Sequence, residues 1–544
     1  MKTLFHHARF FPSTHEKPCD SMLVEHGRII RMGLQEHLKN KIAPGDREVH
    51  LHGHTLIPGL MDAHMHLFAS GVNQKGSVSL REAASIAEVV NMLREAVNTG
   101  QGKIGEWVFG NGWNQDRFQE KRVPSRHDLD RGVPDHPVKI TRMCCHICVV
   151  NSKALQMARI TRDTPDPPGG KIDRDDRGEP TGILRETAME LVDRVIPPVT
   201  DVETIKELIL GTCHQLAAMG IVTVHTDDLG SALNRDQILQ AYWELDSEEK
   251  LPLDVVLQLR VSTPEDIEYH MKKGMHSGRR WNRLAAGAVK IMGDGSLGSR
   301  TAALEAPYDD EPEESGFMLL SRDELEGLMV KAVTHSFDLA VHAIGDQTMN
   351  AILDVVEKHH ALIQEQKVMP AMVHCQIASE EIMERCARLG VSAIIQPIFL
   401  YSDWSIAQNR VGQDRLKTSY CWKTWLDRGV HCAGSSDAPV ESFNPFHNLH
   451  AAVARKDGEL QPAGGWIPEE ALTLEQAVNL MTAAPARLTR EEKTKGRLQE
   501  GCEATFAVLS RPIDLMDPDA IRDMTVEAVY QKGIRMEWPP GTDK

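Results

Sequence analysis

Two histidines separated by one residue are the most informative chemical pattern in this 544-residue chain. His64 and His66 end the apolar run 56–66, which has the composition of a buried strand. Because residues i and i+2 of a strand point to the same side, their imidazoles can meet at one point. Imidazoles are common ligands of divalent metal ions. The pattern therefore predicts one corner of a metal site.

Eight short apolar runs rich in Val, Ile and Ala are the elements that must position such a site. They cover residues 56–66, 220–225, 254–261, 285–292, 339–342, 371–375, 391–396 and 430–437. Amphipathic segments such as 203–219, 322–337, 347–360 and 380–389 lie between them and predict helices. Eight strands alternating with helices predict an α/β fold, the (β/α)8 TIM barrel. A doubly wound open sheet is the alternative, but the early Gly-rich turn it needs is not visible.

The carboxyl ends of barrel strands meet at one face, so residues far apart in the sequence can form one site there. Lys290 is unusual because apolar residues flank it, and a buried ammonium is costly unless it is paired, neutralised or chemically changed. His225, at the end of the second run, is either a further ligand or a core residue. Four imidazoles, a carboxylate and a lysine stand at the other strand ends and predict a metal site: His64, His66, Lys290, His342, His374 and Asp437.

Three segments fall outside the alternation of strands and helices. Residues 1–55 and 491–544 alternate strand-like pieces with turns, and we expect them to complete one β-sandwich domain that flanks the barrel at 56–490. The stretch 68–198 is too long for a barrel loop. Because it follows the strand that ends in His64 and His66, we expect an insertion that begins at the mouth of the barrel and acts as a lid.

Composition narrows the class of protein. A net charge of −17 disfavours nucleic acid as a partner. No run approaches the roughly 20 apolar residues of a membrane span. The first residues lack the apolar core of a signal peptide, and the ten cysteines are scattered, which favours a cytoplasmic protein. We expect a small-molecule substrate and no membrane partner, and a homodimer is compatible with the sequence.

The predicted ligands lie in motifs that resemble those of the amidohydrolase superfamily, and in particular of amidohydrolase family 3, the YtcJ-like proteins. The resemblance covers nearly the whole chain, and the motifs are specific only jointly. They are LIPGLMDAHMH at 56–66, KIMGDGSLGSRTA at 290–302, HAIGD at 342–346, SSDAP at 435–439 and, in the insertion, RxxxHxxxxNSxAL at 142–155.

The resemblance implies a metal-dependent hydrolase of an amide or another non-peptide C–N bond. It implies a carboxylated Lys290 that bridges two metal ions, one held with His64, His66 and Asp437 and the other with His342 and His374. With an unmodified Lys290, one ion would remain. Zn²⁺ suits imidazole and carboxylate ligands best. Asp437 would take the proton from water and deliver it to the leaving amine.

Further residues are candidates for contact with the substrate. An arginine in the lid would suit a substrate carboxylate through a bidentate pair. The candidates are Arg142, His146, Trp113, Asp294 and Gln396. For Trp113 a place in the core is the favoured alternative, and Asp294 could instead orient Lys290 or belong to a plain turn. Two other functions remain open, which are a mononuclear deaminase or N-acyl amino acid hydrolase, and a catalytically silent regulatory relative.

Overall fold

A computed structural model describes residues 1–12, 18–80, 82–100, 102–115, 117–142, 147–167, 170–197, 199–230 and 234–537. The chain divides into two compact units. The first holds residues 1–67, 210–235 and 239–544, and the second holds residues 68–209 with 236–238. The predicted strand ends belong to the first unit, so that unit contains the predicted metal ligands.

An eight-stranded parallel sheet forms the centre of the first unit, which confirms the predicted barrel fold. Its strand order is β21-β20-β19-β18-β17-β16-β15-β7. The strands are buried almost throughout, as expected where both faces of a parallel sheet are covered. They are β7 (Leu60–Met65), β15 (Ile221–Thr226), β16 (Asp254–Arg260), β17 (Leu284–Met292), β18 (Leu339–Ala343), β19 (Pro370–His374), β20 (Ser392–Ile395) and β21 (Cys432–Gly434).

Hydrogen bonds just beyond the last strand join the two edges of this sheet. The backbone N–H of Asp437 donates to the His64 carbonyl at 2.9 Å, and that of His66 donates to the Ala438 carbonyl at 2.7 Å. Small side chains such as Ala63, Ala340 and Ala433 belong to one buried cluster contributed by several strands, as a narrow barrel interior requires. Closure therefore brings the first and eighth strand ends, which carry predicted ligands, side by side.

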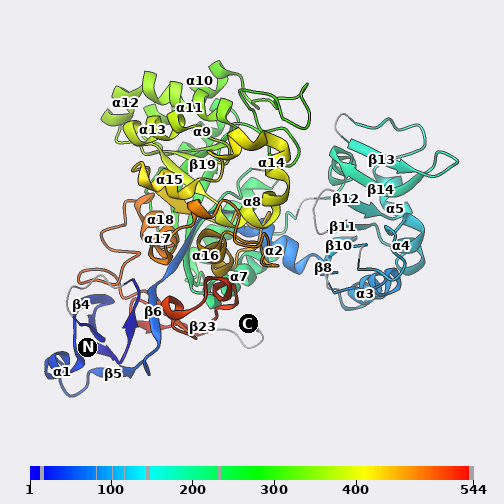
Figure 1. Ribbon diagram of the computed structural model, residues 1–544. Coiled ribbons are helices and arrows are strands. Elements are labelled where there is room, and N and C mark those ends of the chain that lie inside the picture. Colours follow the sequence, from blue (N-terminus) through cyan, green and yellow to red (C-terminus); the bar gives the residue numbers. More distant parts are fainter. Residues whose placement is uncertain are drawn as a thin grey trace. The chain divides into compact units, whose positions relative to one another are not determined.

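The helices of the first unit alternate with these strands along the chain, and Figure 1 shows many of them at the outside of the barrel. They include all four segments predicted as helices. Their bounds are α7 (Val202–Ala218), α8 (Arg235–Ser247), α9 (Pro264–Lys272), α10 (Arg322–Thr334), α11 (Asp346–Lys358), α12 (His360–Glu365), α13 (Glu380–Leu389), α14 (Leu400–Leu416), α15 (Trp422–Asp427), α16 (Pro445–Ala454), α17 (Leu474–Leu480) and α18 (Ala483–Arg487).

The first predicted run is two strands and not one. Thr55–Pro58 forms β6, which pairs with a C-terminal strand, and β7 begins only at Leu60. Gly59 separates them, and a Cβ there would lie 2.6 Å from a methyl group of Val222. Only glycine allows this close approach. At this position the chain passes from the flanking sheet into the barrel.

Two further sheets flank the barrel, and one of them joins both ends of the chain. Figure 1 shows the blue N-terminal β6 beside the red C-terminal β23, and aromatic rings of Phe5, Phe506 and Tyr530 pack together with centroids 4.8–5.3 Å apart. One sheet has the order β4-β3-β1-β5 and the other β2-β6-β22-β23-β24. Their elements are β1 (Lys2–His6), β2 (Arg9–Phe10), β3 (Ser21–Glu25), β4 (Arg28–Gly33), α1 (Gln35–Leu38), β5 (Arg47–His50), β6, β22 (Phe506–Leu509), β23 (Val526–Gln531) and β24 (Ile534–Arg535).

The second unit is built on a mixed seven-stranded sheet with its own core. The strand order is β13-β14-β12-β11-β10-β8, with β9 on β10. Leu93, Phe118 and Ile140 belong to its buried cluster. Its elements are α2 (Leu67–Lys75), β8 (Val78–Ser79), α3 (Ile86–Thr99), β9 (Lys103–Ile104), β10 (Trp107–Trp113), α4 (Arg126–Gly132), β11 (Val138–Arg142), β12 (Ile147–Val150), α5 (Ser152–Met157), β13 (Gly170–Arg174), β14 (Pro180–Glu186) and α6 (Glu190–Asp193).

A buried carboxylate at the start of α4 should stabilise this unit. Asp128 is 2% exposed and accepts hydrogen bonds from Arg122 at 2.7 and 2.9 Å and from the Ser125 amide at 2.8 Å. Burial alone would raise the pKa of Asp128, but these bonds outweigh burial and hold the pKa well below its ordinary value. We expect Asp128→Asn to lower the free energy of unfolding by about 1–2 kcal/mol at pH 7, because Arg122 is half exposed.

The stability lost in Asp128→Asn should depend on pH, because the pKa of Asp128 is lowered in the folded state. A carboxyl whose pKa is lower in the folded state stabilises above its unfolded pKa of about 3.9 and loses that effect as the pH falls. Urea unfolding should therefore show a difference in the free energy of unfolding between wild type and Asp128→Asn at pH 7, and a smaller difference at pH 3, below the unfolded pKa. Asp163→Asn changes an exposed aspartate of the same unit and is the control. An equal difference in the free energy of unfolding at both pH values would contradict a stabilising role of the ionised Asp128 carboxylate.

Candidate metal centre

Three predicted ligands from the first and eighth strand ends converge on one point. Nε2 of His64 and Nε2 of His66 lie 3.2 and 3.3 Å from Oδ1 of Asp437. One ligand atom from each residue lies within 4.8 Å of the others. Oδ1 is buried, yet it accepts no hydrogen bond of good geometry from any described residue. A divalent cation would satisfy this carboxylate and both imidazoles, so the residues fit a metal ion.

The other nitrogen of each imidazole fixes which atom faces this point. Nδ1 of His66 lies 2.8 Å from the Asp227 carbonyl, which can only accept, so Nδ1 carries the hydrogen. Nδ1 of His64 lies 2.6 Å from Oε1 of Gln258, whose amide nitrogen donates to the Ala63 carbonyl. Both rings therefore donate through Nδ1 and present Nε2 to Asp437. Such partners orient metal-binding histidines in many proteins.

The three groups hold their protons very differently. Burial and the nearby Lys290 ammonium lower the pKa of His64 to about 4. Burial also acts to lower the pKa of His66, but the Asp437 carboxylate outweighs it and raises that pKa to about 9. Burial acts to raise the pKa of Asp437, and the two imidazoles hold it well below its ordinary value. At pH 7 the extra proton therefore resides on His66, beside Asp437.

A metal ion and this proton compete for Nε2 of His66, so metal affinity should rise with pH. Below pH 9 an ion must displace the proton, and we expect affinity to fall by up to about tenfold per pH unit as the pH is lowered. The measurement is Zn²⁺ competition between chelator-treated protein and a chromophoric chelator at pH 6.5, 7.5 and 8.5. An affinity that stays constant across this range would exclude His66 as a protonated competitor.

Lys290 lies on β17 with 1% of its surface exposed. Within the described part of the chain, its ammonium forms no hydrogen bond and no ion pair, since Arg260 already pairs with the neighbouring Asp227. Burial lowers the pKa of Lys290 to about 8, although the charge of Asp227 acts to raise it. The predicted conflict between this lysine and its apolar surroundings is therefore present in the fold.

His342 and His374 end the adjacent strands β18 and β19, and their ring centroids lie 4.4 Å apart. The His374 ring is also 5.7 Å from that of His64. His342 donates from Nε2 to the Gly295 carbonyl at 2.9 Å, which leaves Nδ1 as its metal-binding atom. His374 and Asp437 have φ angles of 85° and 56°, a conformation that costs free energy and is common at functional sites. The structure thus gathers all four predicted histidines at one end of the barrel.

Two residues predicted to contact the substrate, Gln396 and Asp294, hold other parts of the site in place. Oε1 of Gln396 accepts from Nδ1 of His374 at 2.9 Å, and its amide nitrogen donates to Ser435 at 2.8 Å. Gln396 therefore positions His374 so that Nε2 is its free nitrogen. Asp294 is fully buried and accepts from the backbone N–H groups of Ala303, Ile344 and Gly345 at 2.9–3.1 Å. It braces the loop after β17 and lies 3.3 Å from Nε2 of His342.

The remaining substrate candidates belong to the second unit or lie outside the described residues. Arg142 ends β11 and donates to the side chain of Gln115 at 2.8 Å. Trp113 is fully buried and stacks on Phe118 with centroids 6.3 Å apart, so it is a core residue of that unit. His146 falls among the residues that the structure does not describe. His225 is buried in β15 and is not part of the three-residue group around Asp437.

Sequence reasoning missed the residues that support the ligands. Gln258 interrupts the apolar run of β16, and that interruption was the available signal. Asp62, two residues before His64, is fully buried and accepts hydrogen bonds from the Ser436 amide and hydroxyl, next to Asp437. Burial raises the pKa of Asp62 to about 7 against these bonds. Asp62 therefore links the two loops that carry His64 and Asp437.

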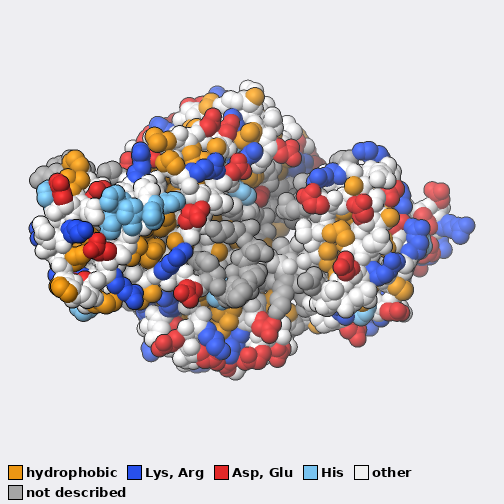
Figure 2. Space-filling view, turned by 90° about the horizontal axis from the view of Figure 1, so that it is seen from below, with side chains coloured by type: hydrophobic (Ala, Val, Ile, Leu, Met, Phe, Trp, Pro, Cys, Tyr) orange, Lys and Arg blue, Asp and Glu red, His pale blue; other side chains and the backbone are white. Residues whose placement is uncertain are grey.

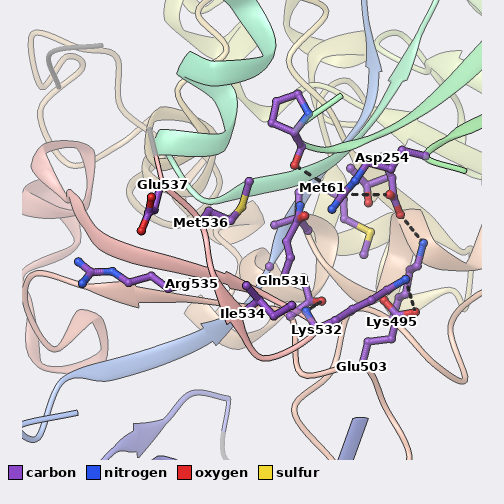
Figure 3. A pocket seen from close by; sticks show the side chains of 17 residues that line it. Met61, Asp254, Lys495, Glu503, Gln531, Lys532, Ile534, Arg535, Met536 and Glu537 are labelled. Carbon is purple, nitrogen blue, oxygen red and sulfur yellow. Dashed lines mark hydrogen bonds and ion pairs between the residues drawn. The ribbon is translucent and has the colours of Figure 1, made fainter. Parts of the chain in front are cut away.

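A cavity of about 350 Å³, shown in Figure 3, has a lining that contains none of the predicted metal ligands. Its lining includes Met61 on β7, Asp254 at the first position of β16, and Lys495, which pairs with Asp254 at 2.6 Å. Met61 and Asp254 stand at the amino ends of their strands, whereas the histidines stand at or near the carboxyl ends. Because the active sites of such barrels lie at the carboxyl ends, the cavity is not the predicted catalytic site.

Comparison with known proteins places these observations in a family. The family model described as "Amidohydrolase family" matches residues 47–535. The protein YtcJ of Bacillus subtilis (strain 168), named as an amidohydrolase, is 32% identical over 98% of this chain and 99% of its own. An N-substituted formamide deformylase of Arthrobacter pascens is 27% identical over 94% of each chain. The crystal structure of an uncharacterized metal-dependent hydrolase from Pyrococcus horikoshii OT3 matches with a TM-score of 0.77 and 29% identity, covering 95% of this chain and 99% of its own.

Among the described residues, the structure contains no helix with the length and apolar character needed to cross a membrane.

Proposed function

This chain belongs to the amidohydrolase family, and from that premise we propose that it hydrolyses an amide or another non-peptide C–N bond of a small molecule. The family and its solved relatives make it a metal-dependent hydrolase. The relative that acts on N-substituted formamides supports a C–N bond as the one cleaved. The net charge of −17 supports a substrate other than nucleic acid.

The position of Asp437 carries the proposed mechanism. Its buried Oδ1 faces Nε2 of both His64 and His66 and is not engaged by any hydrogen bond of good geometry from a described residue. An ionised carboxylate there can accept a proton from an attacking water and then donate it to the leaving nitrogen. Asp437 is ionised at neutral pH, because its pKa lies well below the ordinary value.

The residues that would hold metal form two sets that share Lys290. His64, His66, Lys290 and Asp437 would hold one ion, and Lys290, His342 and His374 the other. Carboxylation of Lys290 would replace its unpaired ammonium by an anion, which suits the charge of the ligand set and removes the burial conflict. When bound, Zn²⁺ lowers the pKa of water and polarises a carbonyl group. Gln258 and Gln396 keep the imidazoles of His64 and His374 in the required tautomers.

Substrate selection is proposed to involve the insertion. Arg142 offers a guanidinium that could pair with a carboxylate on the substrate. An N-acyl amino acid carries such a group, whereas a simple formamide does not. Comparing hydrolysis of N-acyl amino acids with hydrolysis of simple formamides therefore tests the role of this arginine. We also propose a cytoplasmic location with no membrane partner, which agrees with small-molecule substrates.

The experiment is a hydrolysis panel on chelator-treated protein with and without added Zn²⁺. The substrates are N-substituted formamides, N-acyl amino acids and cyclic amides, and the measured products are the released carboxylate and amine. We expect at least one class to be cleaved only after Zn²⁺ is restored. If Zn²⁺ restores cleavage of esters or phosphoesters but of no C–N substrate, the proposed bond is wrong.

A further inference from the structure

A second group of histidines lies on the N-terminal sheet, away from the barrel strands. His6 ends β1 and His50 ends β5, and these parallel strands pair His6 directly with His50. His7 and His52 follow one and two residues later. Figure 2 shows histidine side chains, in pale blue, gathered in a patch on the surface. None of the residues in this group takes part in the catalytic site described above.

The four imidazoles are in direct contact. Nδ1 of His6 lies 2.8 Å from Nδ1 of His7. The rings of His7 and His50 stack with centroids 4.4 Å apart and an interplanar angle of 19°, and His52 lies 4.3 Å from His50. One ligand atom each from His6, His7 and His50 lies within 4.8 Å of the others. The ligand atoms of His64, His66 and Asp437 in the barrel lie equally close to one another.

The backbone holds this group in an unusual conformation. His7 and His52 have φ angles of 57° and 52°, which residues other than glycine rarely adopt. Backbone hydrogen bonds fix the two segments to each other, from the Leu51 amide to the His6 carbonyl at 2.9 Å and from the Gly53 amide to the His7 carbonyl at 2.6 Å. The imidazoles are therefore presented by tied backbone and not by freely moving loops.

Imidazole side chains are suitable ligands for a divalent cation, because a neutral imidazole offers a lone pair. The carboxylate of Glu48, 3.7 Å from Nε2 of His6, adds a negative charge beside the ring of His6.

We propose that His6, His7 and His50 bind one divalent transition-metal ion, with Zn²⁺ as the expected occupant. Imidazole nitrogens select Zn²⁺, Cu²⁺ and Ni²⁺ over Mg²⁺ and Ca²⁺. Zn–N bonds of about 2.0–2.1 Å in tetrahedral geometry place nitrogens about 3.3 Å apart, so the 2.8 Å contact between His6 and His7 needs only a small opening. Because His7 and His50 are exposed, water would complete the coordination.

Coordination through Nδ1 of His50 requires one local exchange of partners. Nδ1 of His50 accepts a hydrogen bond from the His52 amide at 3.0 Å. An ion bound at Nδ1 replaces this contact, and water can then satisfy the exposed amide of His52. The bound ion would link the end of β1 to the turn between β5 and β6. It would therefore tie together two segments of the flanking domain and leave the barrel ligands unchanged.

The first test counts Zn²⁺ ions per chain in the full-length protein. Wild type, His7→Gln and His50→Gln are stripped with chelator, titrated with Zn²⁺ and compared, with circular dichroism as the check on folding. His37→Gln is the matched control, because His37 is an exposed histidine of the same domain with 70% of its side chain exposed. We expect His7→Gln and His50→Gln to bind one Zn²⁺ fewer than wild type and His37→Gln. Equal stoichiometry in all four proteins would overturn the proposal.

A second test needs no variant. Diethyl pyrocarbonate modifies accessible imidazoles, and mass spectrometry of peptides reports the modification rate at each histidine. Zn²⁺ should slow modification at His7 and His50 and leave the rate at His37 unchanged. Equal rates at His7 and His50 with and without Zn²⁺ would overturn the site even if the barrel centre binds its own metal.

Discussion

Replacing Asp437 with asparagine should lower kcat by about 10²–10⁴-fold on any substrate that the protein hydrolyses. Asparagine preserves the size of the side chain but cannot take a proton from water at neutral pH. The side-chain oxygen of asparagine should still lie close to His64 and His66. The hydrogen bond from the backbone N–H of residue 437 to the His64 carbonyl does not involve the side chain and should remain. The loss should therefore appear in kcat more than in KM, and steady-state kinetics measure both.

Asp414→Asn is the matched control for this substitution. Asp414 is 96% exposed at the side chain and, among the residues that the structure describes, pairs with the nearby Lys417, so its replacement should leave kcat unchanged. Metal content must be measured in parallel, because Asp437 is also a proposed ligand. A variant Asp437→Asn that keeps both its metal and its full kcat would remove Asp437 from the proton transfer.

Replacing Lys290 with methionine should remove at least one metal ion per chain and abolish hydrolysis. Methionine has a similar length, but it has no amine that could be carboxylated, so neither proposed ion keeps its shared ligand. Metal analysis of purified wild type and variant measures the first effect. Lys423→Met is the control, because that lysine is exposed and pairs with Asp427 within one helix.

When metal has been stripped from wild type and from Lys290→Met, the variant should be the more stable of the two proteins. The pKa of Lys290 is about 8 in the fold against the ordinary 10.5, so burial of the ammonium costs on the order of 3 kcal/mol below pH 8. This cost shrinks as the pH rises toward 10.5, because the lysine is then neutral in both states. The stability advantage of the methionine variant should follow that trend. Unchanged metal content together with unchanged stability would show that Lys290 is neither a ligand nor a buried unpaired charge.

The barrel was predictable because its strands are continuous apolar runs, a pattern that both-sided burial of parallel strands imposes. The division of the first run was not predicted, although the Pro58-Gly59 pair is a recognised break signal. Its composition is apolar on both sides of the break, since β6 and β7 are both buried. The pairing of β6 with β22 and the close approach of Gly59 to Val222 show where one sheet ends and the other begins.

The convergence of the predicted ligands could be expected for a related reason. His64, His374 and Asp437 stand at strand ends, and barrel topology alone brings such ends together. The role of Gln396 could not be predicted, because spacing does not show whether a polar side chain faces substrate or another side chain. Gln396 holds His374. For Trp113 the sequence favours a place in the core, and its ring packs on Phe118. Hydrogen-bond partners and burial, which depend on packing, decide such roles.

The metal centre at the barrel mouth is tested most directly by anomalous diffraction from crystals of Zn²⁺-loaded protein, measured at the zinc absorption edge. We expect a strong anomalous peak between Nε2 of His64, Nε2 of His66 and Oδ1 of Asp437, and a second peak beside Lys290, His342 and His374. Crystals that contain zinc by fluorescence but show no anomalous peak among His64, His66 and Asp437 would contradict the account.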